Sequence, residues 1–175
     1  MRTIKTGLIL LLAVMLLVGC SDKPGNGGTT GTVSLESITT KVKETYGDDY
    51  LPSMDMDEVT LKDVMGIDVA NIKDFKGQLP MMSTHVDTFL AIEANEGKGD
   101  FVAAELTAYR ESLISSAMMY PMNIAKVQAS EIVQQGDYVF FVMLGAYADG
   151  SEEDEIEFAK AETKKGVDVI NSFFE

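Results

Sequence analysis

The chain has 175 residues, of which 46% are hydrophobic, with 28 acidic and 14 basic side chains, one cysteine, one histidine and no tryptophan. The formal net charge of −14 argues against binding to nucleic acid or to anionic lipid headgroups, because an acidic surface repels phosphate. A single cysteine excludes an intramolecular disulfide, and a single histidine excludes a zinc site built from histidine and cysteine ligands.

The first nineteen residues have the form of an export signal. Arg2 and Lys5 give a basic start, and an uncharged, leucine-rich run of twelve residues follows over 7–18. This run is too short to span a bilayer as a helix, which needs about 20 residues. Small Gly19 and then Cys20 close the run. The pattern resembles the lipobox of bacterial lipoproteins.

By this resemblance, residues 1–19 are a lipoprotein signal peptide and Cys20 is the lipid attachment site. The Cys20 thiol would receive a diacylglyceryl group. With further acyl chains such as palmitate, this would anchor the protein to the extracytoplasmic face of the cell membrane. The alternatives are a plain signal peptide with an incidental cysteine, and a buried helix. The signal holds two basic residues and no acidic one, so the formal charge of 20–175 is −16.

Residues 20–32 are rich in Gly, Ser and Thr, and we expect a flexible tether that spans roughly 20 Å. The composition then changes, and we expect one domain over 33–175. Its first apolar residues have helical spacing before Gly47 and predict an N-terminal helix: Leu35, Ile38, Val42 and Tyr46. Residues 60–63 favour a short helical turn that ends at Gly66.

Two antiparallel strands are predicted over 71–82 and 86–94. The second is the clearer one, because apolar and polar side chains alternate along it. A glycine-containing turn at 96–99 follows. Asp100 is then the expected N-cap of the longest helix, which we expect to end near Tyr120-Pro121.

A hairpin is predicted from strands at 125–134 and 138–144, because Gln135-Gly136-Asp137 has the composition of a tight turn. The second of these strands is apolar on both faces, which is typical of a central strand that is covered on both sides. A last helix is predicted over 152–174, in which Gly166 favours a kink.

This order of elements predicts an α+β fold. We expect a four-stranded antiparallel sheet with a ββαββα core, in which the long helices pack on one face. The N-terminal helix is expected to cover part of the other face.

Four short segments occur in an order that resembles a known family: Val64-Met65-Gly66-Ile67-Asp68, Leu79-Pro80-Met81-Met82, Tyr120-Pro121-Met122 and Gly136-Asp137-Tyr138-Val139-Phe140-Phe141-Val142. With the lipobox and the Gly-rich tether, they resemble the small Gram-positive lipoproteins that contain the uncharacterised domain of unknown function 4358. The resemblance covers about 35–144. It implies the location and the fold, and it transfers no catalytic residue because the family has no established activity.

The methionines bear on metal binding. Met81 and Met82 lie close to His85, and a second group of methionines lies at 118–122. Thioethers are soft ligands that suit Cu(I), which makes Met81, Met82 and His85 the candidate metal ligands. Methionine more often fills irregular gaps in a core, and this one lacks tryptophan. We favour that explanation, and we expect neither a metal nor a cofactor.

The sequence contains few signs of catalysis. No G-x-S-x-G nucleophile elbow is present, and a catalytic triad would need His85. The acidic run at 149–157 lacks the spacing of an EF-hand, and acids at a helix N-terminus explain it better. Gly97-Lys98-Gly99 lacks the spacing of a phosphate-binding loop and is interpreted as a turn. We therefore expect no catalytic residue.

The first expectation for function is a lipid-anchored extracytoplasmic domain that binds a protein or a small ligand without catalysis. The second is a hydrolase that acts on envelope material through acidic residues, and the third is a metal-binding lipoprotein that uses methionines. The expected partners are the membrane, through the lipid on Cys20, and an unidentified protein or small ligand, but not nucleic acid.

Overall fold

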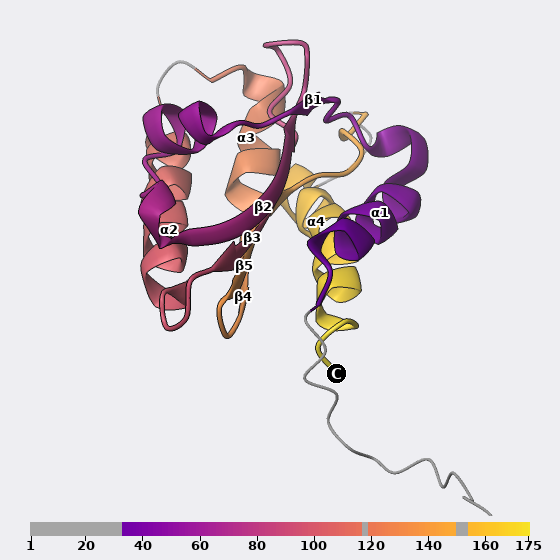
Figure 1. The fold of residues 1–175 in the computed structure, drawn as a ribbon. Coiled ribbons are helices and arrows are strands. Elements are labelled where there is room, and N and C mark those ends of the chain that lie inside the picture. Colours follow the sequence, from indigo (N-terminus) through magenta and orange to yellow (C-terminus); the bar gives the residue numbers. More distant parts are fainter. Residues whose placement is uncertain (1–32, 117–118, 150–153) are drawn as a thin grey trace, which may run out of the picture. The chain divides into compact units, whose positions relative to one another are not determined.

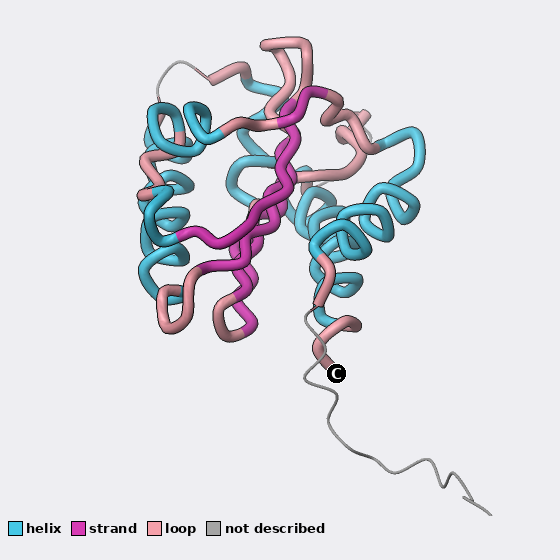
Figure 2. The backbone as a smooth tube through the Cα atoms, in the orientation of Figure 1, coloured by secondary structure: helices cyan, strands magenta, loops and turns pink. Residues whose placement is uncertain are grey.

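The computed structural model describes residues 33–116, 119–149 and 154–175. Within these residues, one antiparallel sheet of five strands lies between two layers of helices (Figures 1 and 2). In their order across the sheet, the strands are β1 (Met54–Asp55), β2 (Ile72–Leu79), β3 (Thr88–Ala94), β5 (Tyr138–Met143) and β4 (Glu131–Gln135).

The helices of the described residues are α1 (Leu35–Tyr46), α2 (Gly99–Ser115), α3 (Pro121–Ala129) and α4 (Glu155–Asn171). In Figure 1 the sheet is seen nearly edge-on, with α2 on its left and with α1 and α4 on its right. The described residues also contain three single turns. Gly47–Asp49 and Val69–Asn71 are 3-10 turns, and Thr60–Val64 is a π-helical turn.

Both faces of the sheet are apolar at its centre, so the domain has two cores. On one face, side chains of the sheet pack with α1 and α4: Leu35, Ile38, Val42, Phe89, Ala91, Phe140, Val142 and Ile170. On the other face, they pack with α2 and with the segment before β2: Leu61, Met65, Ile67, Leu90, Ile92, Val102, Leu106, Val139 and Phe141. The alternation of side chains along β3 and β5 sends neighbouring residues to opposite cores.

Local capping explains where α1 and α4 begin. The Ser34 hydroxyl accepts a hydrogen bond from the Ser37 backbone N–H (3.2 Å) at the start of α1. The Asp154 carboxylate accepts from two backbone N–H groups in the first turn of α4. Gly47 ends α1 with a φ of 54°, a conformation that glycine adopts readily. The predicted N-terminal helix and its terminator are thereby confirmed.

The start of α2 is fixed by the turn between β4 and β5. The Asp137 carboxylate in that turn accepts hydrogen bonds from the backbone N–H groups of Gly97 and Gly99, both at 3.0 Å. These bonds favour the charged carboxylate and lower the pKa of Asp137. A Cβ on Gly99 would lie 2.2 Å from the Gly136 carbonyl oxygen, so only glycine fits there. Asp100, the predicted N-cap, lies one residue inside α2, whose N-cap is Lys98.

Two features of the predicted architecture are wrong. The sheet has a fifth strand, β1, which is only two residues long and pairs with the end of β2. The long helices do not share a face, because α2 and α4 cover opposite faces of the sheet. The antiparallel α+β character and the central position of β5 between β3 and β4 are confirmed.

The largest local error concerns residues 121–134. The predicted strand over 125–134 is helix α3 up to Ala129, and strand β4 begins only at Glu131. The buried face of α3 includes Asn123 and Lys126, which are 1% and 3% exposed. These polar side chains interrupt the apolar stripe, so the helical periodicity of α3 is not apparent from the sequence.

The other boundaries differ by a few residues at the ends. The first predicted strand ends at Leu79 rather than at 82, and the second begins at Thr88 rather than at 86. Helix α2 ends at Ser115, before the predicted end near Tyr120. Helix α4 runs over Glu155–Asn171 and continues through Gly166 as one helix.

Candidate functional site

A buried ion pair joins α3 to the residue before β3. Lys126 Nζ lies 2.7 Å from Asp87 Oδ1, and the two side chains are 3% and 0% exposed. Lys126 Nζ also donates to the Gly145 carbonyl oxygen (2.6 Å) and lies 3.5 Å from the centroid of the Tyr147 ring. Burial lowers the pKa of Lys126, and the adjacent Asp87 carboxylate opposes this shift. One ammonium group therefore connects α3, β3 and the segment that follows β5.

Tyr147 and Asn123 extend this network. The Tyr147 hydroxyl donates to Asp87 Oδ2 (2.9 Å) and lies 3.1 Å from Asn123 Oδ1. Asn123 Nδ2 donates to the Thr84 carbonyl oxygen (2.9 Å), which ties α3 to the loop between β2 and β3. Burial, with a further contribution from the charge of Asp87, raises the pKa of Tyr147. The phenol is therefore held in its neutral form, in which it can donate.

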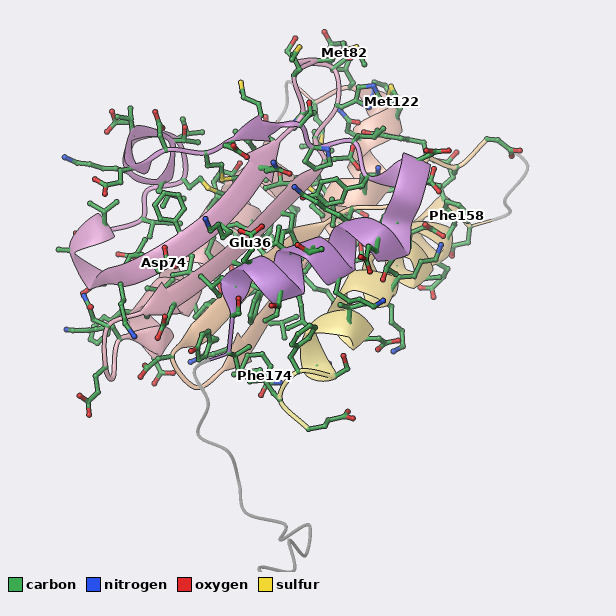
Figure 3. All side chains as sticks on the ribbon, turned by 45° about the vertical axis from the view of Figure 1, so that its right-hand side comes forward. Glu36, Asp74, Met82, Met122, Phe158 and Phe174 are labelled. Atoms are coloured by element: carbon green, nitrogen blue, oxygen red, sulfur yellow. The ribbon has the colours of Figure 1, made fainter. Side chains whose placement is uncertain are left out.

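The network lies at one end of the sheet, which we call the distal end. It is the end where β3 begins and β5 finishes, since Thr88 pairs with Met143 there. The opposite end contains the β4–β5 turn, and Tyr138, directly after that turn, interacts with the Val33 backbone and with the Phe174 ring, whose centroid is 5.4 Å away. Figure 3 shows Met82 and Met122 close to the same end of the domain, far from Phe174.

Two hollows open at the distal end beside α3. One has a volume of about 250 Å³ and is lined by residues of α3, α4 and the segment after β5, among them Lys126, Tyr147 and Phe158. The other, which we call the α2–α3 hollow, has a volume of about 260 Å³. Its lining is Ile114, Ser116, Met119, Ile124, Val127 and Gln128.

Exposed apolar side chains surround the α2–α3 hollow. Ile114 at the end of α2 is 42% exposed and Ile124 on α3 is 45% exposed. Outside this lining, Tyr120 and Met122 at the start of α3 are 54% and 51% exposed, and Met122 lines the other hollow. A group of exposed apolar residues around a hollow is typical of a surface that binds a partner.

The candidate metal ligands lie in the loop between β2 and β3. Met81 and Met82 are 78% and 60% exposed, so neither fills a gap in the core. Together with His85 they line a hollow of about 110 Å³. The His85 ring contacts the Tyr147 ring edge-on, with 5.3 Å between the centroids. In the described part of the chain, no group of three His, Cys, Asp or Glu side chains is arranged to hold a metal ion.

A polar cleft lies elsewhere, between α1 and β2. It has a volume of about 400 Å³, and Glu36 and Asp55 are among its lining residues. Glu36 is 3.6 Å from Lys76 Nζ, and Asp55 accepts a hydrogen bond from Gln78 Nε2 (2.6 Å). Glu36 is therefore ion-paired with Lys76, whereas Asp55 is hydrogen-bonded to the neutral amide of Gln78.

Several predicted features lie outside the described residues. These are Cys20, the signal peptide, the tether before Val33 and part of the acidic run at 149–157. Among the described residues, no helix combines the length and the apolar character needed to cross a bilayer. Gly97 and Lys98 lie in the predicted turn before α2, and Gly99 is the first residue of that helix.

Sequence reasoning missed the network at the distal end. The predicted strands over 86–94 and 125–134 contain Asp87 and Lys126, respectively. The two are 39 residues apart, and no motif links them. The one available signal was a lysine between apolar neighbours, Ile124-Ala125 before it and Val127 after it.

The described residues thus form a mixed α/β domain with one antiparallel sheet of five strands. The chain belongs to the family described as Domain of unknown function (DUF4358), which matches residues 45–144. The matched region contains the five described strands with α2 and α3, whereas α4 and nearly all of α1 lie outside it. Comparisons with curated proteins and with solved structures gave no match.

Proposed function

We propose that the protein is a lipid-anchored, extracytoplasmic binding domain that engages a partner protein through the α2–α3 hollow. The observation that carries this proposal is the position of the hollow. Exposed Ile114 and Ile124 lie at the distal end, whereas Val33, the first described residue of the domain, lies at the other end. A lipid on Cys20 would therefore tether the domain by the end that is farther from the hollow.

The course of α2 supports this separation of the two ends. Helix α2 begins beside the β4–β5 turn, where Asp137 binds the Gly99 backbone. Its seventeen residues span about 25 Å at 1.5 Å per residue, so Ile114 is carried toward the distal end. Asn123 of α3 is bonded to the β2–β3 loop at the same end. The hollow would face away from the membrane, toward other molecules of the envelope.

The chemistry of the surface indicates the kind of partner. The isoleucine and methionine side chains that line the hollow can receive an apolar side chain of another protein, and methionine adapts its shape readily. The formal charge of −16 for 20–175 would steer a basic partner toward the domain. We therefore propose a protein partner that presents an apolar side chain within a basic surface.

The anchor is tested by labelling cells with a fatty-acid precursor. We expect the wild-type protein to carry the label and to partition into detergent, and we expect Cys20→Ser to carry none, because oxygen does not replace the thiol as lipid acceptor. The domain of the variant should still fold, since Val33 and the residues after it form their own cores. Equal labelling of the two proteins would overturn the anchor.

The binding surface is tested by placing a photo-crosslinking amino acid at Ile114, at Ile124 or at Phe101. Phe101 is the matched control, because it is also an exposed apolar residue of α2, 58% exposed, but lies near the helix start. We expect one adduct of the same mass from Ile114 and Ile124 in intact cells, and none from Phe101. Adducts of equal yield from all three positions would contradict a site at the hollow.

A further inference from the structure

We propose that Met81, Met82 and His85 form a binding site for a monovalent copper ion. These residues belong to the loop between β2 and β3. The site is separate from the α2–α3 hollow and does not depend on the function proposed above.

A tight turn brings the ligands together. The His85 backbone N–H donates to the Met82 carbonyl oxygen (3.1 Å), which closes a turn of four residues from Met82 to His85. The first and last residues of such a turn have Cα atoms less than about 7 Å apart. Met81 precedes the turn directly, and all three side chains line the same hollow of about 110 Å³.

The imidazole of His85 has an unused nitrogen. Its Nδ1 is buried and has no hydrogen-bond partner among the described residues. A buried polar atom without a partner is unfavourable, and each such atom in a folded protein calls for an explanation. If the proton resides on Nε2, no buried donor is left unsatisfied, and Nδ1 then offers a lone pair. His85 lines the hollow together with Met81 and Met82, so a metal ion held there would meet its imidazole.

The exposure of Met81 and Met82 argues against the alternative explanation that these methionines fill gaps in the core. A methionine that fills a gap in the core is buried, but Met81 and Met82 are 78% and 60% exposed. Met119, which packs against the core, shows the contrasting behaviour. Two large apolar side chains that are left in water contribute nothing to the core, so their thioether groups are available to a ligand.

The chemical nature of the three ligands determines which metal ion would bind. Two thioethers and one imidazole are neutral, soft donors, and such ligands favour Cu(I) over hard cations such as calcium and magnesium, which take oxygen ligands. A structural zinc site would need four ligands drawn mainly from cysteine, histidine and carboxylates, and the loop supplies only His85 and Asp87, of which Asp87 is already paired with Lys126. The excess of acidic groups over the whole chain raises the local concentration of any cation.

The test uses the chain from residue 20 with Cys20→Ala in every sample, because a free thiol would itself bind copper. Cu(I) is titrated without oxygen against a competing chelator. We expect one equivalent to bind. Since the loss of an outer-shell partner already weakens a metal site by roughly 10–100-fold, the loss of a ligand in Met81→Leu, Met82→Leu or His85→Ala should weaken it by at least about tenfold.

Met122→Leu is the matched control, because Met122 is 51% exposed but does not line the hollow, and its affinity should be unchanged. His85 is the only histidine, so a single imidazole signal reports on it by NMR, and this signal should shift on addition of Cu(I). Competition curves that coincide for the parent protein and a triple variant would overturn the proposal. So would an imidazole signal that does not move, or an equal loss of affinity in Met122→Leu.

Discussion

The buried pair of Lys126 and Asp87 is the residue-scale feature on which the distal end depends. Taking two charges out of water is unfavourable, and their attraction compensates only when the remaining hydrogen-bonding groups are satisfied. Here Lys126 also reaches the Gly145 carbonyl, and Asp87 also accepts from Tyr147. Because the partners come from α3, β3 and the segment after β5, the pair specifies how these three parts meet.

We predict that Asp87→Ala lowers the free energy of unfolding by about 3–5 kcal/mol, because it leaves the Lys126 ammonium buried without a counter-charge. Urea denaturation of the purified domain measures this. Glu44→Ala is the control, since it breaks the exposed pair of Lys41 and Glu44, whose side chains are 58% and 61% exposed. That variant should change the free energy by less than about 1 kcal/mol. Equal effects of the two substitutions would contradict the role assigned to the buried pair.

The residues of the candidate site show why sequence reasoning reached only part of it. His85, Met81 and Met82 were found because they lie within five positions of one another and have distinctive chemistry. Lys126 was missed because its role depends on a contact with Asp87, 39 residues away. A lysine is normally exposed, and apolar neighbours alone do not show that this one is 3% exposed.

At the scale of elements, helices α1 and α4 are joined by an unusually close contact. The Tyr46 hydroxyl donates to the Glu162 carbonyl oxygen (2.8 Å) and accepts from the Gly166 backbone N–H (3.0 Å). A Cβ on Gly166 would lie 2.9 Å from the Tyr46 hydroxyl and 3.0 Å from Val142 Cγ1. Glycine at this position lets the two helices approach each other and the sheet.

We predict that Gly166→Ala destabilises the domain by about 1–3 kcal/mol through overpacking, although alanine is the better helix former by about 1 kcal/mol. In a Tyr46→Phe background the same substitution should have a smaller effect, because the hydroxyl that meets the new methyl group is gone. Chemical denaturation of the four proteins in this double-mutant cycle measures the difference. Stabilisation by Gly166→Ala would show that the helices are not in close contact. Lys164→Ala, on the exposed face of α4, is the control.

The elements could be predicted where the pattern of apolar residues is clear. Helix α1 has one apolar and one polar face, whereas strand β5 is apolar on both faces. Both were found with nearly correct bounds. Helix α3 was missed because its buried face carries Asn123 and Lys126, whose polar groups are satisfied by tertiary contacts. Strand β1 has two residues, which is too short to show any periodicity.

At the scale of the whole molecule, β5 separates two cores. Phe140 lies on the face covered by α1 and α4, where its ring centroid is 6.0 Å from that of Phe174. Phe141 lies on the face covered by α2, at 5.8 Å from the Tyr109 ring. Both phenylalanines are 0% exposed. The sequence predicted cover on both sides of β5, but an amphipathic helix does not indicate which face of a sheet it will cover.

We predict that Phe140→Ala and Phe141→Ala each lower the free energy of unfolding by about 3–5 kcal/mol, because each leaves a cavity in a separate core. Phe101→Ala is the control, since Phe101 is 58% exposed, and should change it by less than about 0.5 kcal/mol. Denaturant titration measures all three variants. A loss below 1 kcal/mol for either core variant would mean that the corresponding helix layer contributes little to stability.

The pairing of α1 with α4 also has a consequence for the order of events when the chain is made. Tyr46 and its acceptor Glu162 are 116 positions apart, so α1 emerges long before the helix that covers its apolar side. The core on that face can close only when Ile170 has been delivered, because contacts between distant segments form late. Until then, α1 lacks the helix that packs beside it, and we expect the core on that face to remain incomplete. We therefore expect the domain to reach its full stability only after its last helix has been made.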